Sequence, residues 1–209
     1  MNRQPKQLLG NVALISEQIN PQRLQVVLNQ LKNSLVAAIP GDVVEFGCYI
    51  GTTSLFIRRA LDTAKESGQR QFWAYDSFAG LPAKHSADNS TAGSQFVAGE
   101  LSVSKKQLLQ EFHKAHLVPP RVYKAWFKDV TPTQLPEHIA FAFLDGDFYE
   151  SITDSLKLVW PRLSTGGIIT IDDYQREALP GVERAVDEFF QGKKISLRQE
   201  HNIAIIKKL

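Results

Sequence analysis

The chain has 209 residues, a formal net charge of +2, 43% hydrophobic residues and 22% charged residues, values that are ordinary for a globular protein with one sizeable core. A charge so close to neutral does not predict binding to nucleic acid or to a membrane surface, and the single cysteine, Cys48, excludes an internal disulfide and a zinc-ligand pattern. The apolar stretches are far too short for a membrane span and residues 1–10 are polar, so a cytoplasmic location is expected.

Residues 1–20 are polar and irregular, and we expect them to form an arm. Apolar residues then recur at helical spacing over residues 21–39, which predicts an amphipathic helix that ends at Pro40-Gly41. We expect this helix to pack on the core, with a homodimer contact or a substrate lid as the alternatives. Because no domain boundary is visible, residues 1–40 are expected to form one unit with a domain at 41–209.

Strands and helices alternate along the rest of the chain. Strands are expected at 43–46, 72–75, 122–126, 139–144 and 167–171, and helices at about 52–65, 104–116, 149–163 and 182–190. This alternation predicts an α/β fold with a doubly wound, mostly parallel sheet. Two short apolar runs, 195–197 and 203–206, add an antiparallel hairpin at the C-terminal end.

A long polar segment with glycines, residues 78–103, follows the second strand. Loops of this length in a compact domain are usually functional or mobile. Its position predicts a lid that becomes ordered over bound ligands.

Two of the predicted strands end abruptly in aspartates, at Asp145-Gly146-Asp147 and at Asp172-Asp173. Ligands of open α/β sheets lie beyond the carboxyl ends of the strands. Four carboxylates at two such ends would repel each other, so we expect a divalent cation such as Mg²⁺ between them. If the strand geometry persists, Asp145 and Asp147 point to the same face. The alternative is that these acids cap helices and turns.

The turn from the first strand to the first helix contains Gly47 and Gly51, with Thr52-Thr53 as the expected helix cap. It would place backbone amides and a helix N-terminus beside a ligand. The glycine-rich motif that binds dinucleotides requires glycine at the position where this chain has Tyr49. S-adenosylmethionine (SAM) has no pyrophosphate, so the turn suits SAM better.

Acidic and aromatic residues near this turn fit the same cofactor. Glu45 suits the positive amino and sulfonium groups of SAM, with a salt-bridged strand end as the alternative. Asp76 ends the second strand, where it is placed to accept hydrogen bonds from both ribose hydroxyls, a role shared with nucleotide enzymes; a helix cap is the alternative. Trp126-Phe127 are placed to stack on adenine, with a position in the core as the alternative.

Six motifs, in this order along the chain, resemble the macrocin O-methyltransferase family. They lie at residues 75–82, 96–101, 126–129, 144–151, 161–167 and 171–174. The family consists of SAM- and magnesium-dependent enzymes, best known for methylating sugar hydroxyls in antibiotics. The resemblance covers about residues 41–190, and six motifs in register are hard to obtain by chance.

The resemblance implies a metal site formed by Asp145, Asp172 and Asp173. It implies that Asp147 is the general base, for which His85 in the long loop is a rival. It also implies contacts to SAM from Glu45, Asp76 and Ser77. The N-terminal segment looks shorter than in the antibiotic enzymes, and Ala125 stands where the family often has glycine; both departures concern the identity of the acceptor.

Together these observations predict a SAM-dependent, metal-assisted O-methyltransferase that acts on a hydroxyl of a small acceptor, a sugar or glycoside. The proposed cation would lower the pKa of a coordinated hydroxyl, which is otherwise a poor nucleophile. A catechol-type O-methyltransferase and a SAM-binding module without catalysis are the alternatives. The four aspartates argue against the second, because cofactor binding alone does not require them.

Overall fold

A computed structural model describes residues 12–209, so the first part of the predicted arm, residues 1–11, lies outside the described residues. The helices are α2 (Pro21–Val36), α3 (Thr52–Ala64), α4 (Lys105–Lys114), α5 (Tyr149–Val159) and α6 (Pro180–Phe190). The strands are β1 (Asp42–Phe46), β2 (Phe72–Asp76), β3 (Arg121–Lys124), β4 (Ile139–Leu144), β5 (Leu163–Ile171), β6 (Ile195–Glu200) and β7 (Ile203–Lys208).

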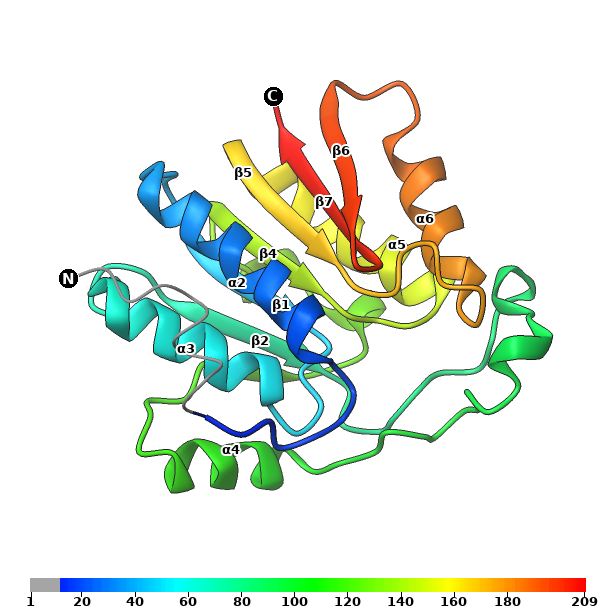
Figure 1. The fold of residues 1–209 in the computed structure, drawn as a ribbon, viewed down its shortest axis with the longest axis horizontal. Helices are drawn as coiled ribbons and strands as arrows, with labels where there is room; N and C mark the ends of the chain where they lie inside the picture. Colours follow the sequence, from blue (N-terminus) through cyan, green and yellow to red (C-terminus); the bar gives the residue numbers. More distant parts are fainter. Residues whose placement is uncertain (1–11) are drawn as a thin grey trace.

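Within residues 12–209 these strands form a seven-stranded sheet in the order β3-β2-β1-β4-β5-β7-β6 (Figure 1). Strands β1 to β5 run parallel, whereas β7 is antiparallel to β5 and to β6. The predicted doubly wound sheet with a C-terminal antiparallel hairpin is therefore confirmed. The strand order reverses between β1 and β4, and ligands of such sheets bind at this point.

Helices cover both faces of the sheet, which explains the continuous apolar runs of its central strands. Phe141 and Phe143 of β4 pack with α2 and α3, while Ala142 and Leu144 pack with α5 and α6 (Figure 1). Every residue of β4 is buried. Of the helices in residues 12–209, none is both long and apolar enough to cross a bilayer.

Helix α2 packs on the core through its apolar stripe, as predicted. Leu24, Val27 and Leu31 are fully buried, and the side chain of Asn20 caps the helix by accepting a hydrogen bond from the Arg23 amide at 2.9 Å. An asparagine before a proline at the first helical position is a strong start signal. The sheet and α2 thereby share one core.

The start of α3 differs from the prediction. The residue before the helix is Gly51, which has a φ of 98°, and Thr52 and Thr53 are buried in the first turn. The Thr52 hydroxyl is 2.6 Å from that of Ser16. The cap predicted at Thr52-Thr53 is therefore wrong, because the left-handed glycine, and no threonine side chain, turns the chain into the helix.

The long loop is closed at its base. The Leu81 amide donates to the Glu100 carbonyl at 2.8 Å, and the Gly99 amide donates to the Leu81 carbonyl at 2.9 Å. Between them lie two 3₁₀ turns, Ser86–Asp88 and Thr91–Gly93. Figure 1 shows this loop, in teal to green, reaching away from the sheet toward α6. Its function as a lid stays a prediction.

Candidate active site

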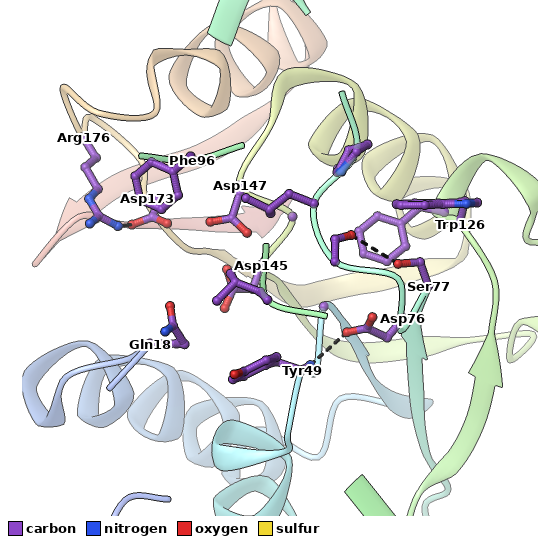
Figure 2. A pocket seen from close by; sticks show the side chains of 18 of the residues that line it. Gln18, Tyr49, Asp76, Ser77, Phe96, Trp126, Asp145, Asp147, Asp173 and Arg176 are labelled. Carbon is purple, nitrogen blue, oxygen red and sulfur yellow. Dashed lines mark hydrogen bonds and ion pairs between the residues drawn. The ribbon is translucent and has the colours of Figure 1, made fainter. Parts of the chain in front are cut away.

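A cavity of about 330 Å³ lies at the carboxyl ends of the parallel strands, at the point where the strand order reverses. One side of its wall consists of the turn after β1, the end of β2 and the segment after β3. The other side consists of the acidic turns after β4 and β5 (Figure 2). The predicted residues in the wall are Gly47, Tyr49, Asp76, Ser77, Trp126 and Phe127 on the first side, and Asp145, Asp147 and Asp173 on the second.

The carbonyl of Asp145 approaches Gly47 so closely that only glycine fits there. A Cβ atom at Gly47 would lie 1.7 Å from that carbonyl oxygen, and the φ of Gly47 is +85°. The first glycine of the turn is thus required where the ends of β1 and β4 meet. This contact joins the two sides of the cavity.

Asp76 accepts hydrogen bonds from three backbone amides, two of which belong to the turn after β1. Its Oδ2 accepts hydrogen bonds from the amides of Cys48 at 2.9 Å and Tyr49 at 2.8 Å (Figure 2). Its Oδ1 accepts one from the Phe78 amide at 2.7 Å. Since an ionised carboxylate has about four acceptor directions, roughly one remains for a ligand. Asp76 therefore shapes the turn as well as lining the cavity.

Glu45 does not reach the cavity, and neither Gly51 nor Thr52 lies among the residues that line it within the described chain. The Glu45 side chain is fully buried and accepts a hydrogen bond from the Ser54 hydroxyl. Its Oε1 has no partner among residues 12–209. Burial and, more weakly, Asp76 raise the pKa of Glu45 to about 8, against a hydrogen bond from Ser54 that lowers it. In its neutral form, Glu45 connects the end of β1 to α3 through the hydrogen bond from Ser54.

The pKa of Glu45 predicts how stability changes with pH. The native state holds the proton of Glu45 more tightly than the unfolded chain does. The contribution of Glu45 to the free energy of unfolding is therefore complete below pH 4.5 and is lost as the pH rises toward 8. Glu45→Gln stays neutral, so we expect wild type to lose about 1 kcal/mol per pH unit relative to the variant in this window. Urea unfolding at several pH values measures the difference. If the free energies of unfolding of wild type and Glu45→Gln change equally with pH, the raised pKa is contradicted.

Three carboxylates meet on the acidic side of the cavity. Asp145, Asp147 and Asp173 each place an oxygen within 4.8 Å of the others (Figure 2). The strand geometry assumed for Asp145 and Asp147 does not persist, because β4 ends at Leu144 and the φ of Asp147 is 57°. Asp173 has a similar φ of 59°. Left-handed backbone at two non-glycine residues is uncommon and concentrates at functional sites.

These acids raise one another's pKa values. Burial, followed by Asp172 and Asp147, raises the pKa of Asp145 well above its usual value. Burial, followed by Asp173 and Asp172, raises the pKa of Asp147 to about 8. The cluster is therefore short of positive charge. Closely spaced carboxylate oxygens that lack positive charge are a donor set that fits a hard divalent cation.

Asp172, the third predicted ligand, is held by an arginine that the sequence analysis did not find. Arg23 of α2 donates from Nε to Asp172 Oδ1 at 2.7 Å and from a terminal nitrogen to Asp173 Oδ1 at 2.6 Å. Arg23 is only 8% exposed. A signal was present in the sequence, since Arg23, Val27, Gln30 and Ser34 recur at helical spacing and are all buried.

Loss of Arg23 should destabilise the metal-free protein. Arg23→Met leaves buried Asp172 without its arginine and leaves Asp173 with Arg176 alone, and breaking a buried ion pair costs about 3–5 kcal/mol. Magnesium should restore part of this loss, because a bound cation would supply the missing charge. Thermal unfolding with chelator and with magnesium measures both effects. Arg184→Met, which removes an exposed pair with Glu188, is the control. An equal loss under both conditions would show that Arg23 only packs.

A second arginine and an aromatic ring from the long loop complete the acidic side. Arg176 donates to Asp173 Oδ1 at 2.7 Å, and its guanidinium lies 5.4 Å from the ring centre of Phe96 (Figure 2). Asp173 therefore accepts hydrogen bonds from two arginines, Arg23 and Arg176. Phe96 brings the loop into the cavity wall. Neither Phe96 nor Arg176 was predicted as a site residue from the sequence.

Comparison with known proteins identifies the family. Residues 13–203 match the model of the macrocin-O-methyltransferase (TylF) family. A tetracenomycin-C 4'-O-methyltransferase of Streptomyces olivaceus, whose substrate carries a dimethoxyrhamnosyl group, is 35% identical over 75% of this chain and 62% of its own length. The demethyldecarbamoylnovobiocin O-methyltransferase of Streptomyces niveus is 32% identical over 82% of this chain and 66% of its own length.

The chain thus spans slightly less than two thirds of these two relatives. Among solved structures, the O-methyltransferase NovP is 28% identical, with a TM-score of 0.79 over 91% of this chain and 81% of NovP. The fold is therefore that of class I SAM-dependent methyltransferases. The match to the family model covers nearly the whole described chain and agrees with the motifs around the cavity. The chain belongs to the macrocin O-methyltransferase family.

Proposed function

We propose that the protein is a SAM-dependent, divalent-metal-assisted O-methyltransferase that methylates a hydroxyl of a sugar or glycoside. One observation carries this proposal: the carboxylates of Asp145, Asp147 and Asp173 share a single cavity with the wall formed by the turn after β1. A cofactor on that wall and an acceptor on the acids would lie side by side. Family membership supports the choice of cofactor and reaction.

SAM would occupy the first side of the cavity, where Gly47 and Tyr49 present the turn and Asp76 offers its remaining acceptor to the ribose. Trp126 and Phe127 lie in the same wall and would flank the adenine. SAM supplies a methyl group that forms a bond to the acceptor oxygen as its bond to sulfur breaks, so that S-adenosylhomocysteine leaves. Glu45 is proposed to support the start of the turn after β1, since its carboxyl accepts a hydrogen bond from Ser54 of α3.

Asp145 and Asp173 would hold the divalent cation, which when bound lowers the pKa of a coordinated acceptor hydroxyl. Arg23 and Arg176 fix Asp173 through one oxygen, so its second oxygen remains for the cation. Asp172 as a direct ligand stays a prediction, because among the described residues it belongs neither to the carboxylate cluster nor to the cavity wall. Mg²⁺ suits such sites because it binds carboxylates and keeps open positions.

Asp147 would accept the proton of the acceptor hydroxyl. Its carboxylate belongs to the cluster, yet it comes from the turn before α5 and is separate from the two arginine-bound aspartates. General-base catalysis requires a group within hydrogen-bond reach of the proton that it removes. Asp147 offers an oxygen within 4.8 Å of those of Asp145 and Asp173, which supports a role beside the proposed cation site.

A small hydroxylated acceptor would lie beside Phe96 and Arg176, which line the same cavity. The relative from Streptomyces olivaceus is named for the 4'-O-methylation of a rhamnosyl tetracenomycin, and the relative from Streptomyces niveus for the O-methylation of demethyldecarbamoylnovobiocin. These names support a sugar or glycoside over a catechol. We also propose that residues 1–40 and 41–209 form one unit, which the packing of α2 on the sheet supports. A cytoplasmic location and a homodimer are proposed as well.

The acceptor class is tested with radiolabelled SAM, magnesium and two panels of acceptors. One panel contains deoxysugar glycosides with vicinal hydroxyls, and the other contains catechols of similar size. We expect label to be transferred to members of the glycoside panel. Transfer to catechols alone would replace the proposed acceptor class, and tight SAM binding without transfer to either panel or to a wider screen would favour a binding module.

A further inference from the structure

Asp88, in the long loop, is a fully buried carboxylate outside the cavity. Its Oδ1 accepts a hydrogen bond from the Tyr149 amide at 2.7 Å, and its Oδ2 accepts one from the His85 amide at 2.9 Å. Tyr149 is the first residue of α5 and lies 61 positions further along the chain. A loop acid therefore bonds to the start of a helix that belongs to another part of the fold.

Asp88 also lies against the start of α6. A Cβ atom at Gly181, the second residue of α6, would be 1.8 Å from Asp88 Oδ1 and 3.0 Å from Tyr149 Cβ. The carboxylate thus sits between two helix N-termini; burial raises the pKa of Asp88, and the hydrogen bonds from the Tyr149 and His85 amides oppose this effect. The residue before α5, Phe148, is apolar and cannot cap the helix with its own side chain. Asp88 supplies that cap from the loop.

The capped end of α5 carries the proposed base. Asp147 lies two residues before Tyr149 in left-handed backbone, and Ser151 of the first turn of α5 lines the cavity. Because such backbone costs free energy, it persists only where its surroundings hold it. The bond from the Tyr149 amide to Asp88 is one of the contacts that hold this turn.

The same loop reaches the cavity on its other side. Phe96 lies in the cavity wall, and the backbone at Gly93 packs so closely on the Ala178 carbonyl that a Cβ there would lie 2.0 Å from it. The His85 ring stacks on the Tyr149 ring at 5.0 Å. The loop is therefore fastened to the starts of α5 and α6 between its closed base and Phe96.

We propose that Asp88 is a positioning residue for methyl transfer. By joining the loop that carries Phe96 to the turn that carries Asp147, it sets the proposed base relative to the acceptor. This inference rests on the proposed function, since it concerns the same acidic turn. Asp88 touches neither the cofactor wall nor the metal cluster, so its loss should leave SAM binding and magnesium binding intact.

The first test compares Asp88→Ala and Asp88→Asn with wild type. A displaced catalytic group can lower the rate by about 10²-fold, so we expect a fall in kcat of that order for alanine. Asparagine keeps an acceptor for the Tyr149 amide and should recover part of the rate. Calorimetry should give unchanged affinity for SAM. Hydrogen exchange should become faster at residues 145–151, a readout that does not require a known acceptor and so stands even if the proposed function fails.

Gly181→Ala tests the same contact from the other side. Its new methyl group must displace the Asp88 carboxylate, so this variant should reproduce the loss of kcat. In the double variant Asp88→Ala/Gly181→Ala the methyl group finds space, so the combined loss should be smaller than the sum. Tyr149→Phe is the matched control. It removes the hydrogen bond from the Tyr149 hydroxyl to Glu188 and keeps the backbone amide that donates a hydrogen bond to Asp88.

Three results would overturn the inference. One is an Asp88→Ala protein that melts at a lower temperature but keeps the wild-type kcat well below its melting point, which would make Asp88 purely structural. Another is a loss of SAM affinity as large as the loss of kcat. The third is that the losses of kcat from Asp88→Ala and Gly181→Ala add fully in the double variant, which would show that the two residues do not interact.

Discussion

Asp147→Asn should lower kcat by about 10²–10⁴-fold, the usual contribution of a general base. Asparagine has nearly the same size but does not accept the proton at neutral pH. Asp145→Asn should fail differently, because it removes a charged ligand of the cation. Its apparent magnesium affinity should fall, and excess magnesium should partly restore the rate. Activity measured against magnesium concentration for both variants separates the two roles.

The outcome for Asp147→Asn decides its assignment, because Asp147 lies in the same carboxylate cluster as Asp145. If excess magnesium rescues both variants equally, Asp147 is another ligand and the base must be sought elsewhere. His85, the rival expected from the sequence, is not among the residues that line the cavity and stacks on Tyr149. Asp154→Asn is a suitable control. It makes the same change within α5, the helix that follows Asp147, at a partly exposed position that pairs with Lys157.

Removal of divalent metal should abolish methyl transfer and leave SAM binding intact. The proposed cofactor wall holds Asp76, whose carboxylate bonds to backbone amides, while the cation site is formed by the turns after β4 and β5. Calorimetric titration of SAM with and without chelator, beside an activity assay, tests this separation. Full activity in thoroughly metal-depleted protein would refute a metal-assisted reaction. Loss of SAM binding on chelation would mean that the two sites are coupled.

The order of strands and helices could be predicted because each element carries its own local signal. The apolar run of β4 is buried on both faces, and Ser104 caps α4 through a capping box with Gln107. The aspartates at strand ends meet because the parallel strands of a sheet end at one edge. The fold and the position of the cavity follow from such periodicity and strand-end rules.

The contacts that refine the site are long-range; helical spacing could mark Arg23 as buried, but periodicity does not reveal the partners in these contacts. Arg23 bonds to an aspartate 149 positions away, and Asp88 bonds to an amide 61 positions away. Glu45 was expected to face the cofactor, but alternation along β1 buries it against Ser54 of α3. The backbone of Asp147 leaves the strand conformation, which residue type alone does not predict. These details depend on tertiary packing that the sequence pattern does not encode locally.

Transfer of a deuterated methyl group from labelled SAM, followed by analysis of the product, tests the central claim most directly. The protein is incubated with the best glycoside of the acceptor panel, with magnesium and with chelator, and the methylated atom is located by nuclear magnetic resonance. The account predicts a deuterated methyl ether on a sugar hydroxyl oxygen that forms only in the presence of the divalent cation. A methyl group on nitrogen or carbon, or the same ether formed at the same rate with chelator, would contradict it.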